Sequence, residues 1–124
     1  MKFDYELNID KVYTLKTPWD EEYKVKAFAL RYLLPDRLSV SLFDIENCEP
    51  FLDVTVNIPD EPVSCDDCAF VDTNNYPWIC KFLEDNHLAT STGYIGMSGY
   101  CTYPEYKFDL SKLSKEGDES DGSM

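Results

Sequence analysis

Four stretches in the first half of the chain are predicted β-strands, because apolar and polar residues alternate along the last three of them. The alternation indicates strands with one buried face, except that the second stretch becomes apolar on both faces toward its end. The stretches are residues 12–16, 23–32, 38–42 and 51–58. Turn-forming residues at 18–22 and 44–50 separate them in pairs. The sequence therefore predicts two antiparallel hairpins in this half of the chain.

The second half is predicted to contain one principal helix. Two prolines make residues 58–67 a loop, and a short strand over 68–72 follows it. Pro77 suits the first turn of a helix, and the apolar residues after it recur at helical spacing, which predicts a helix over about 76–87. Its shared apolar face consists of Trp78, Ile79, Phe82 and Leu83.

Three segments complete the predicted organisation. Residues 90–99 contain three glycines and several hydroxyl side chains, which favours a flexible loop, and 100–110 alternate enough for a closing strand. The Gly, Ser and acidic residues of 111–124 predict a disordered tail. With 124 residues and 44% apolar content, the chain suits a single α+β domain over 1–110, mainly an antiparallel sheet with one helix packed on it.

The charge of the chain is strongly one-sided. It has 24 Asp and Glu against 11 Lys and Arg, a net charge of -13, of which the segment 111–124 supplies only -2. Between Leu38 and Cys80 there are nine carboxylates and no Lys or Arg. Such a charge repels nucleic acid and anionic membranes and attracts basic protein surfaces, although it also serves solubility alone in many acidic domains.

The carboxylates expected to contact a basic partner are those in predicted exposed turns. They are Asp60, Glu61, Asp66 and Asp67 first, and then Asp44, Glu46 and Glu49. The N-terminus lacks the apolar region of a signal peptide, and no run approaches the ~18 apolar residues of a membrane span. We therefore expect a cytoplasmic protein, whose five cysteines are thiols or metal ligands rather than disulfides.

Cys65 and Cys68 have the C-x-x-C spacing that lets two thiolates bind one tetrahedral zinc ion. If the helix runs back antiparallel to strand 68–72, its end brings His87 toward Cys68, and Cys101 follows a loop long enough to return there. The predicted structural Zn²⁺ ligands are therefore Cys65, Cys68, His87 and Cys101. Cys80 and Cys48 are lower-ranked alternatives, and incidental thiols are an open alternative to zinc altogether.

Catalysis has little support in the sequence. A redox role for C-x-x-C is disfavoured because Asp66 and Asp67 lie between the thiols and raise their pKa. Asp72 is the only carboxylate that we would consider for acid–base chemistry, and a side chain that caps the turn before the helix explains it better. His87 is the sole histidine, so we expect a protein that is not an enzyme.

The C-terminal half carries a family resemblance. The segments Cys68-Ala-Phe-Val-Asp-Thr-Asn-Asn75, Pro77-Trp78 and Ser98–Leu110, within a match over roughly residues 66–113, resemble a family of small uncharacterised proteins carried by phages and conjugative elements of Gram-positive bacteria. The chain also looks like an anti-CRISPR protein of the type II-A class. The resemblance implies a mobile-element origin and carries no catalytic residue with it.

Together these observations predict a non-enzymatic phage counter-defence protein. It would bind a basic surface of a type II CRISPR effector nuclease of the Cas9 type and block the loading of target DNA. The alternative is a zinc-stabilised accessory or regulatory module that binds another protein of a mobile element.

Overall fold

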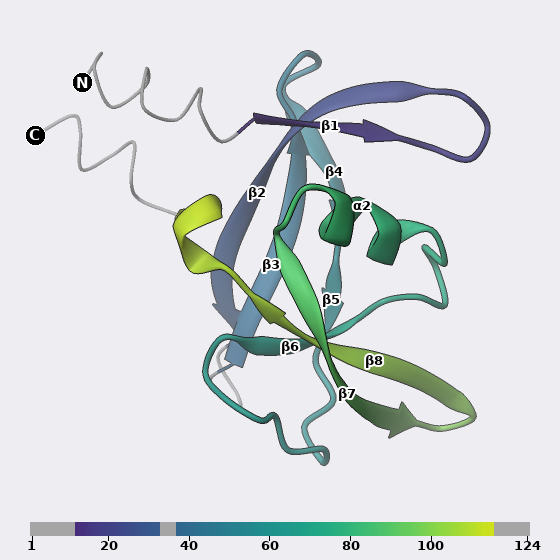
Figure 1. Cartoon of the computed structure of the whole chain (residues 1–124), viewed down its shortest axis with the longest axis vertical. Coiled ribbons are helices and arrows are strands. Elements are labelled where there is room, and N and C mark those ends of the chain that lie inside the picture. Colours follow the sequence, from purple (N-terminus) through teal and green to yellow (C-terminus); the bar gives the residue numbers. More distant parts are fainter. Residues whose placement is uncertain (1–11, 33–36, 116–124) are drawn as a thin grey trace, which may run out of the picture.

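The structure, a computed structural model, describes residues 12–32 and 37–115, and its strands form two sheets (Figure 1). The first sheet contains, in spatial order, β1 (Val12–Lys16), β2 (Glu22–Tyr32), β3 (Arg37–Asp44) and β4 (Glu49–Asp53), with β9 (Ser114–Lys115) beside β2. The second contains β5 (Thr55–Val56), β6 (Cys68–Val71), β8 (Cys101–Phe108) and β7 (Ala89–Ser98). Every strand pair is antiparallel except β2 with β9. The predicted fold class, mainly antiparallel sheet with one principal helix, is confirmed.

Both predicted hairpins of the first sheet are present. Strand β1 pairs with β2, and β3 pairs with β4. Along β3 the side chains of Leu38, Val40 and Leu42 are at most 2% exposed, while the serines between them are half-buried. The alternation in the sequence therefore sets the register that turns one face of this sheet toward the core.

The predicted strand 51–58 is divided between the two sheets. It begins as β4 of the first sheet and ends as β5 of the second, with Val54 at the junction. The Val54 N–H donates to the Val40 carbonyl at 2.8 Å, and the Val54 carbonyl accepts from the Asp72 N–H at 2.8 Å. One fully buried residue thus joins the two sheets through its own backbone.

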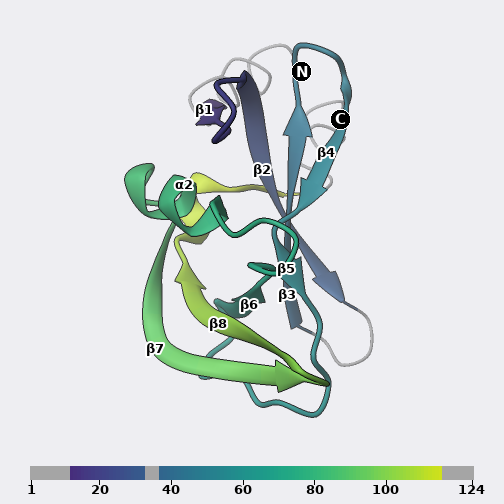
Figure 2. The ribbon, with the colours of Figure 1, turned by 90° about the vertical axis from the view of Figure 1, so that its right-hand side faces the viewer.

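Helix α2 (Ile79–Asp85) lies at the junction of the sheets (Figure 2). Ile79, Phe82 and Leu83 point into a common core, with Leu15 of the first sheet and Phe108 of the second among their buried neighbours. The helix is shorter than the predicted span of 76–87, since turns occupy the residues just before and after it. Among the described residues it is the only α-helix.

The prediction of a flexible loop at 90–99 is wrong, because these residues form most of strand β7. Two of the glycines in this segment are required by close packing and by turn geometry rather than by flexibility. A Cβ on Gly96 would lie 2.7 Å from the ring of Phe70, so only glycine fits there. Gly99 adopts a φ of 63° in the turn between β7 and β8, where glycine carries no steric cost.

The fold also extends past the predicted domain end at residue 110. Residues Leu110–Lys112 form a 3-10 helix, and β9 follows it. Leu113 and Ser114 are at most 1% exposed, so the chain is part of the packed body up to this point. The rest of the predicted tail, 116–124, lies outside the described residues.

Candidate functional site

The proline-rich segment 58–67, called the acidic loop below, covers the outer face of the second sheet. Glu105 of β8, which is only 1% exposed, makes the main contacts that hold this loop on the sheet. One Glu105 oxygen accepts a hydrogen bond from the Ser64 N–H, and the other accepts from the Ser64 hydroxyl, each at 2.7 Å. The Thr92 hydroxyl donates to the same carboxylate at 2.6 Å. Three donors thus compensate the burial of this charge.

These hydrogen bonds decide the protonation state of Glu105. Burial alone would raise its pKa, but the hydrogen bonds from Thr92 and Ser64 to the ionised form outweigh that effect and hold the pKa below its ordinary value. Glu105 is therefore a buried carboxylate that stays charged and that ties the acidic loop to the sheet.

Further contacts fix the loop at its start, middle and end. The Arg37 guanidinium donates to the Ile58 carbonyl at 2.9 Å, and that of Arg31 donates to the Asp66 carbonyl at 3.4 Å. In the middle, the Glu61 carboxylate accepts from the Met97 N–H at 3.0 Å. The loop is consequently a pre-organised surface rather than a free segment.

The predicted contact acids of this loop differ in availability. Asp60 and Asp66 are exposed, and their carboxylates make no hydrogen bond or ion pair with another residue that the structure describes. Glu61 and Asp67 are half-buried, and Glu61 already bonds to strand β7. Asp60 and Asp66 are therefore the two carboxylates that the loop presents to solvent.

The other three predicted contact acids lie elsewhere. Asp44, Glu46 and Glu49 belong to the β3–β4 hairpin, at the opposite end of the molecule from the acidic loop (Figure 1). Asp44 is 2% exposed, and its carboxylate accepts hydrogen bonds from the Glu46 N–H and from the Asn47 N–H and side-chain amide. The Asn47 amide is the main reason that the Asp44 pKa is lowered. Asp44 shapes a turn, so the nine carboxylates do not form one continuous face.

The predicted metal ligands are brought together only in part. The sulfurs of Cys65 and Cys68 lie 2.9 Å apart at the end of the acidic loop. Cys68 is 1% exposed, and its burial, together with the neighbouring Cys65 sulfur, raises its pKa to about 12. Cys68 is therefore a buried, protonated thiol, and Cys65 beside it is half-buried. The cause of the raised pKa is burial and the Cys65 sulfur, whereas the sequence pointed to the carboxylates of Asp66 and Asp67.

Neither of the other two predicted ligands joins this pair. Cys101 begins β8 beside the turn, whereas Cys68 pairs with Lys107, six residues along the same strand, or roughly 20 Å at the rise of a strand. His87 is exposed just after α2, with a φ of 57°. In the described part of the chain no three Cys, His, Asp or Glu side chains lie in metal-binding proximity. The residues present do not fit a four-ligand zinc site in this conformation.

The alternative cysteine ligands are also distant from the dithiol in the fold. Cys48 is exposed in the β3–β4 turn, where it adopts a φ of 56°. Cys80 is half-buried on α2, next to the hydroxyl of Tyr106. Cys80 is thus a packing residue of the helix.

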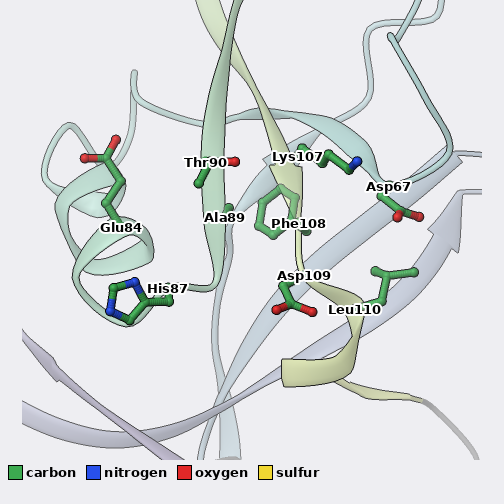
Figure 3. Close-up of a pocket in the computed structure, with 9 residues that line it drawn as sticks. All are labelled: Asp67, Glu84, His87, Ala89, Thr90, Lys107, Phe108, Asp109 and Leu110. Carbon is green, nitrogen blue, oxygen red and sulfur yellow. The ribbon is translucent and has the colours of Figure 1, made fainter.

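An open pocket of about 440 Å³ lies where the end of α2 faces the second sheet. Figure 3 shows Glu84 and His87 on one side of strand β7, and Asp67, Lys107 and Asp109 on the other side. Three carboxylates, one imidazole and one ammonium group line it, without a Ser or Cys nucleophile. This mixed lining does not form a catalytic constellation of nucleophile, base and orienting group.

Asp72 takes the structural role that the sequence favoured. It is 7% exposed, and its carboxylate accepts hydrogen bonds from the Asn75 N–H at 3.2 Å and the Asn75 amide at 2.8 Å. Asp44 and Asn47 make the same Asp-x-x-Asn turn in the β3–β4 hairpin. Both aspartates close turns, so neither is a candidate acid or base.

Sequence reasoning missed two features of this region. Glu105 stands between Pro104 and Tyr106 in an otherwise uncharged, aromatic stretch, and that isolation was the available signal of a buried carboxylate. The second feature is the set of exposed apolar side chains on the β7–β8 hairpin. Because the sequence predicts a loop there, it does not predict a strand that presents these side chains to solvent.

The acidic loop, the dithiol, α2 and the β7–β8 hairpin all lie within residues 29–121, which match the family model of a domain of unknown function, DUF4313. The chain is a member of the DUF4313 family. Searches of curated proteins and of solved structures found no significant match to this DUF4313 protein. No helix among the described residues of the DUF4313 chain is long and apolar enough to cross a membrane.

Proposed function

We propose that this DUF4313 protein is a non-enzymatic counter-defence protein that binds a basic surface of a Cas9-type nuclease and prevents target DNA from loading. The observation that supports the proposal most is the acidic loop, a pre-organised surface that presents Asp60 and Asp66 on a chain with a net charge of -13. The mobile-element resemblance of residues 66–113 supplies the class of partner.

Electrostatics makes such an inhibitor reasonable. A nuclease of this class holds guide and target in positively charged channels and reads its short DNA motif with arginines. A carboxylate-bearing loop that is already ordered loses little conformational entropy when it binds in or beside such a channel. The bound protein would then exclude DNA by charge and by volume.

Exposure and hydrogen bonding rank the carboxylates that we propose as contacts. Asp60 and Asp66 are the leading contacts because they are exposed in the acidic loop. Asp67, which follows Asp66 in the chain, lines the pocket. Asp44 is removed from the set since it closes a turn, and Glu46 and Glu49 lie at the opposite end of the molecule.

The experiment is a titration of the guide-loaded nuclease with the wild-type protein and two charge-reversed variants. Asp60→Lys/Asp66→Lys should weaken binding at least about tenfold and flatten its salt dependence between about 50 and about 500 mM. The matched control, Glu46→Lys/Glu49→Lys, makes the same charge change at the other end and should bind like the wild type.

Three outcomes would contradict the proposal. The wild type fails to bind the nuclease, its affinity is independent of salt, or both double variants weaken binding equally. Capture of a protein only from cells that express a mobile element would instead favour an accessory module of that element.

A further inference from the structure

Strand β7, the turn after it and the first half of β8 carry no charged side chain, in a chain of which 28% is charged. Residues 89–104 contain no Asp, Glu, Lys, Arg or His. The segment nevertheless lies on the surface, because most of its residues are exposed. Solubility therefore does not explain its composition, and a surface that is kept free of charge is typical of a contact region.

Large apolar side chains project from this hairpin. Tyr94 is 67% exposed, Ile95 61%, Met97 55%, and Tyr100, in the turn, is fully exposed. The described part of the chain has only one other large apolar side chain that is this exposed, Trp19 in the β1–β2 turn. The exposed apolar surface is thus concentrated on one element, and Tyr in particular is enriched in protein contacts.

Strand β7 also presents an open edge. It is the last strand of its sheet, and in the described residues no strand pairs with its outer side (Figure 2). Ser98 and Cys101 pair across a two-residue turn, so Ser98 and Gly96 direct their backbone groups toward β8. Ile95 and Met97, at the alternate positions, therefore direct theirs outward.

A single carboxylate covers this edge. The Met97 N–H donates outward to Glu61 of the acidic loop at 3.0 Å, which confirms the direction assigned above. Edge strands are normally protected by charged residues, prolines, bulges or short length. Strand β7 has no charged residue or proline, and its one irregularity lies between Ser91 and Ile95, so the regular edge starts at Ile95. The protection comes from a neighbouring loop, and an incoming strand can replace it.

We propose that β7 accepts an extended strand of a partner protein, and that this strand carries alternating apolar and basic residues. Its backbone would bond to the outward groups of Ile95 and Met97, and its apolar side chains would contact the exposed side chains of the hairpin. A Lys or Arg on it would pair with the Glu61 carboxylate once the Met97 N–H has been taken over. The charge of Glu61 and of the adjacent Asp60 selects a basic segment.

The same charges argue against a second copy as the occupant. Two chains joined antiparallel through β7 would bring two acidic loops together, each with Asp60 and Glu61, on molecules that each carry -13. The inference goes beyond the proposed function because it concerns a different element, and it holds for a partner of any origin.

The test uses two synthetic peptides as probes, acetyl-Lys-Val-Thr-Val-Lys-Val-amide and its counterpart with Glu in place of Lys. Amide chemical shifts of the labelled full chain are followed during titration. We expect the basic peptide to shift the Ile95 and Met97 amides saturably and the acidic peptide to bind at least about tenfold more weakly.

Three variants make the test specific. Met97→Pro removes an outward donor without touching the hydrogen bonds to β8, and Ile95→Lys places a like charge against the peptide, so each should abolish the shifts. Trp19→Lys makes the same exchange of an exposed apolar side chain elsewhere and should leave binding unchanged. The spectrum of the remaining residues verifies that each variant is folded.

Several results would overturn the inference. Equal binding of both peptides, or no shift on β7 at millimolar basic peptide, would exclude a basic strand as the occupant. A dimer in solution whose Ile95 and Met97 amides are protected before any peptide is added would assign the edge to a second copy. Shifts of the Ile95 and Met97 amides by the basic peptide, in a wild-type protein that does not bind the nuclease, would instead support this inference while the proposed function fails.

Discussion

Glu105 and Ser64, 41 residues apart in sequence, are joined by two hydrogen bonds of 2.7 Å that use both oxygens of one buried carboxylate. The backbone bond and the hydroxyl bond together fix the position and the orientation of Ser64. Because Ser64 directly precedes Cys65, they also fix where the acidic loop turns back into β6. This relationship decides the shape of the surface on which the proposed function depends.

Glu105→Gln should lower the free energy of unfolding by about 2 kcal/mol. The amide keeps the shape of the side chain but carries no charge. Its NH₂ group would face the donors of Ser64 or Thr92, so hydrogen bonds to an ionised acceptor would be lost in a buried site. Urea denaturation measures the difference, with Glu49→Gln, at an exposed turn, as the matched control. Equal midpoints for the two variants would show that the Glu105–Ser64 contact does not stabilise the fold.

The same carboxylate gives the stability a pH dependence of known sign. Since the pKa of Glu105 is lower in the folded than in the unfolded chain, the stabilisation is present above the ordinary Glu value of 4.5 and is lost as the pH falls through the lowered pKa. We expect the stability difference between wild type and Glu105→Gln to shrink as the pH falls through this range. A difference that stays constant from neutral pH to about pH 3 would mean that the pKa of Glu105 is the same in the folded and in the unfolded chain.

The cysteines should differ sharply in reactivity. Cys48 is exposed, whereas Cys68 is buried with a pKa raised to about 12, so its thiolate is scarce at pH 8. Iodoacetamide at pH 8 is expected to modify Cys48 and to spare Cys68, as mapped by peptide mass, and denaturant should abolish the difference. Fast alkylation of Cys68 in the folded chain would refute both its burial and its raised pKa.

Metal analysis tests the zinc hypothesis directly. Only two of the four predicted ligands, Cys65 and Cys68, lie together in the described structure, and two thiols do not complete a tetrahedral site. We therefore expect protein purified without chelator or His tag to contain no stoichiometric zinc and to keep its thermal midpoint in EDTA. One zinc per chain that is lost in Cys65→Ser/Cys68→Ser would restore the metal site and require His87 or Cys101 to move.

Gly96→Ala should destabilise the protein by about 1–3 kcal/mol, the usual range for overpacking. The added methyl would lie 2.7 Å from the ring of Phe70, which is 3% exposed and has little room to shift. Phe70→Leu removes the ring, so the cost of Gly96→Ala should be smaller in that background, as a double-mutant cycle measures. Identical costs in the two backgrounds would place the strain elsewhere.

The strands and the helix were predictable because their patterns are local. Alternation over residues 38–42 gave the inward face of β3, and Pro77 with the helix-spaced residues after it gave α2. Of the two aspartates that close turns, only Asp72 has a role that the sequence predicts. The neighbours of Asp72 predict its place in a turn. The sequence does not show that Asn47 occupies the carboxylate of Asp44, so it predicts a partner contact for Asp44 instead.

The remaining errors share a long-range cause. Gly96 suggests flexibility in sequence, but its reason is the Phe70 ring 26 residues away. Whether Cys101 reaches the dithiol depends on the direction in which β8 runs beside β6, which no local pattern encodes. Grouping carboxylates by sequence likewise failed, since the β3–β4 hairpin and the acidic loop lie at opposite ends of the fold. The net charge follows from the sequence alone, whereas the positions of the charged side chains relative to one another depend on the fold.

Val54 gives the molecule a mechanical property. Its N–H belongs to one sheet and its carbonyl to the other, so a sliding motion of the sheets would break both hydrogen bonds at a site that water does not reach. The two sheets are therefore expected to unfold in one step and to move as one body when a partner pulls on either. A load applied at the acidic loop or at β7 would be borne by the whole domain rather than absorbed by a hinge.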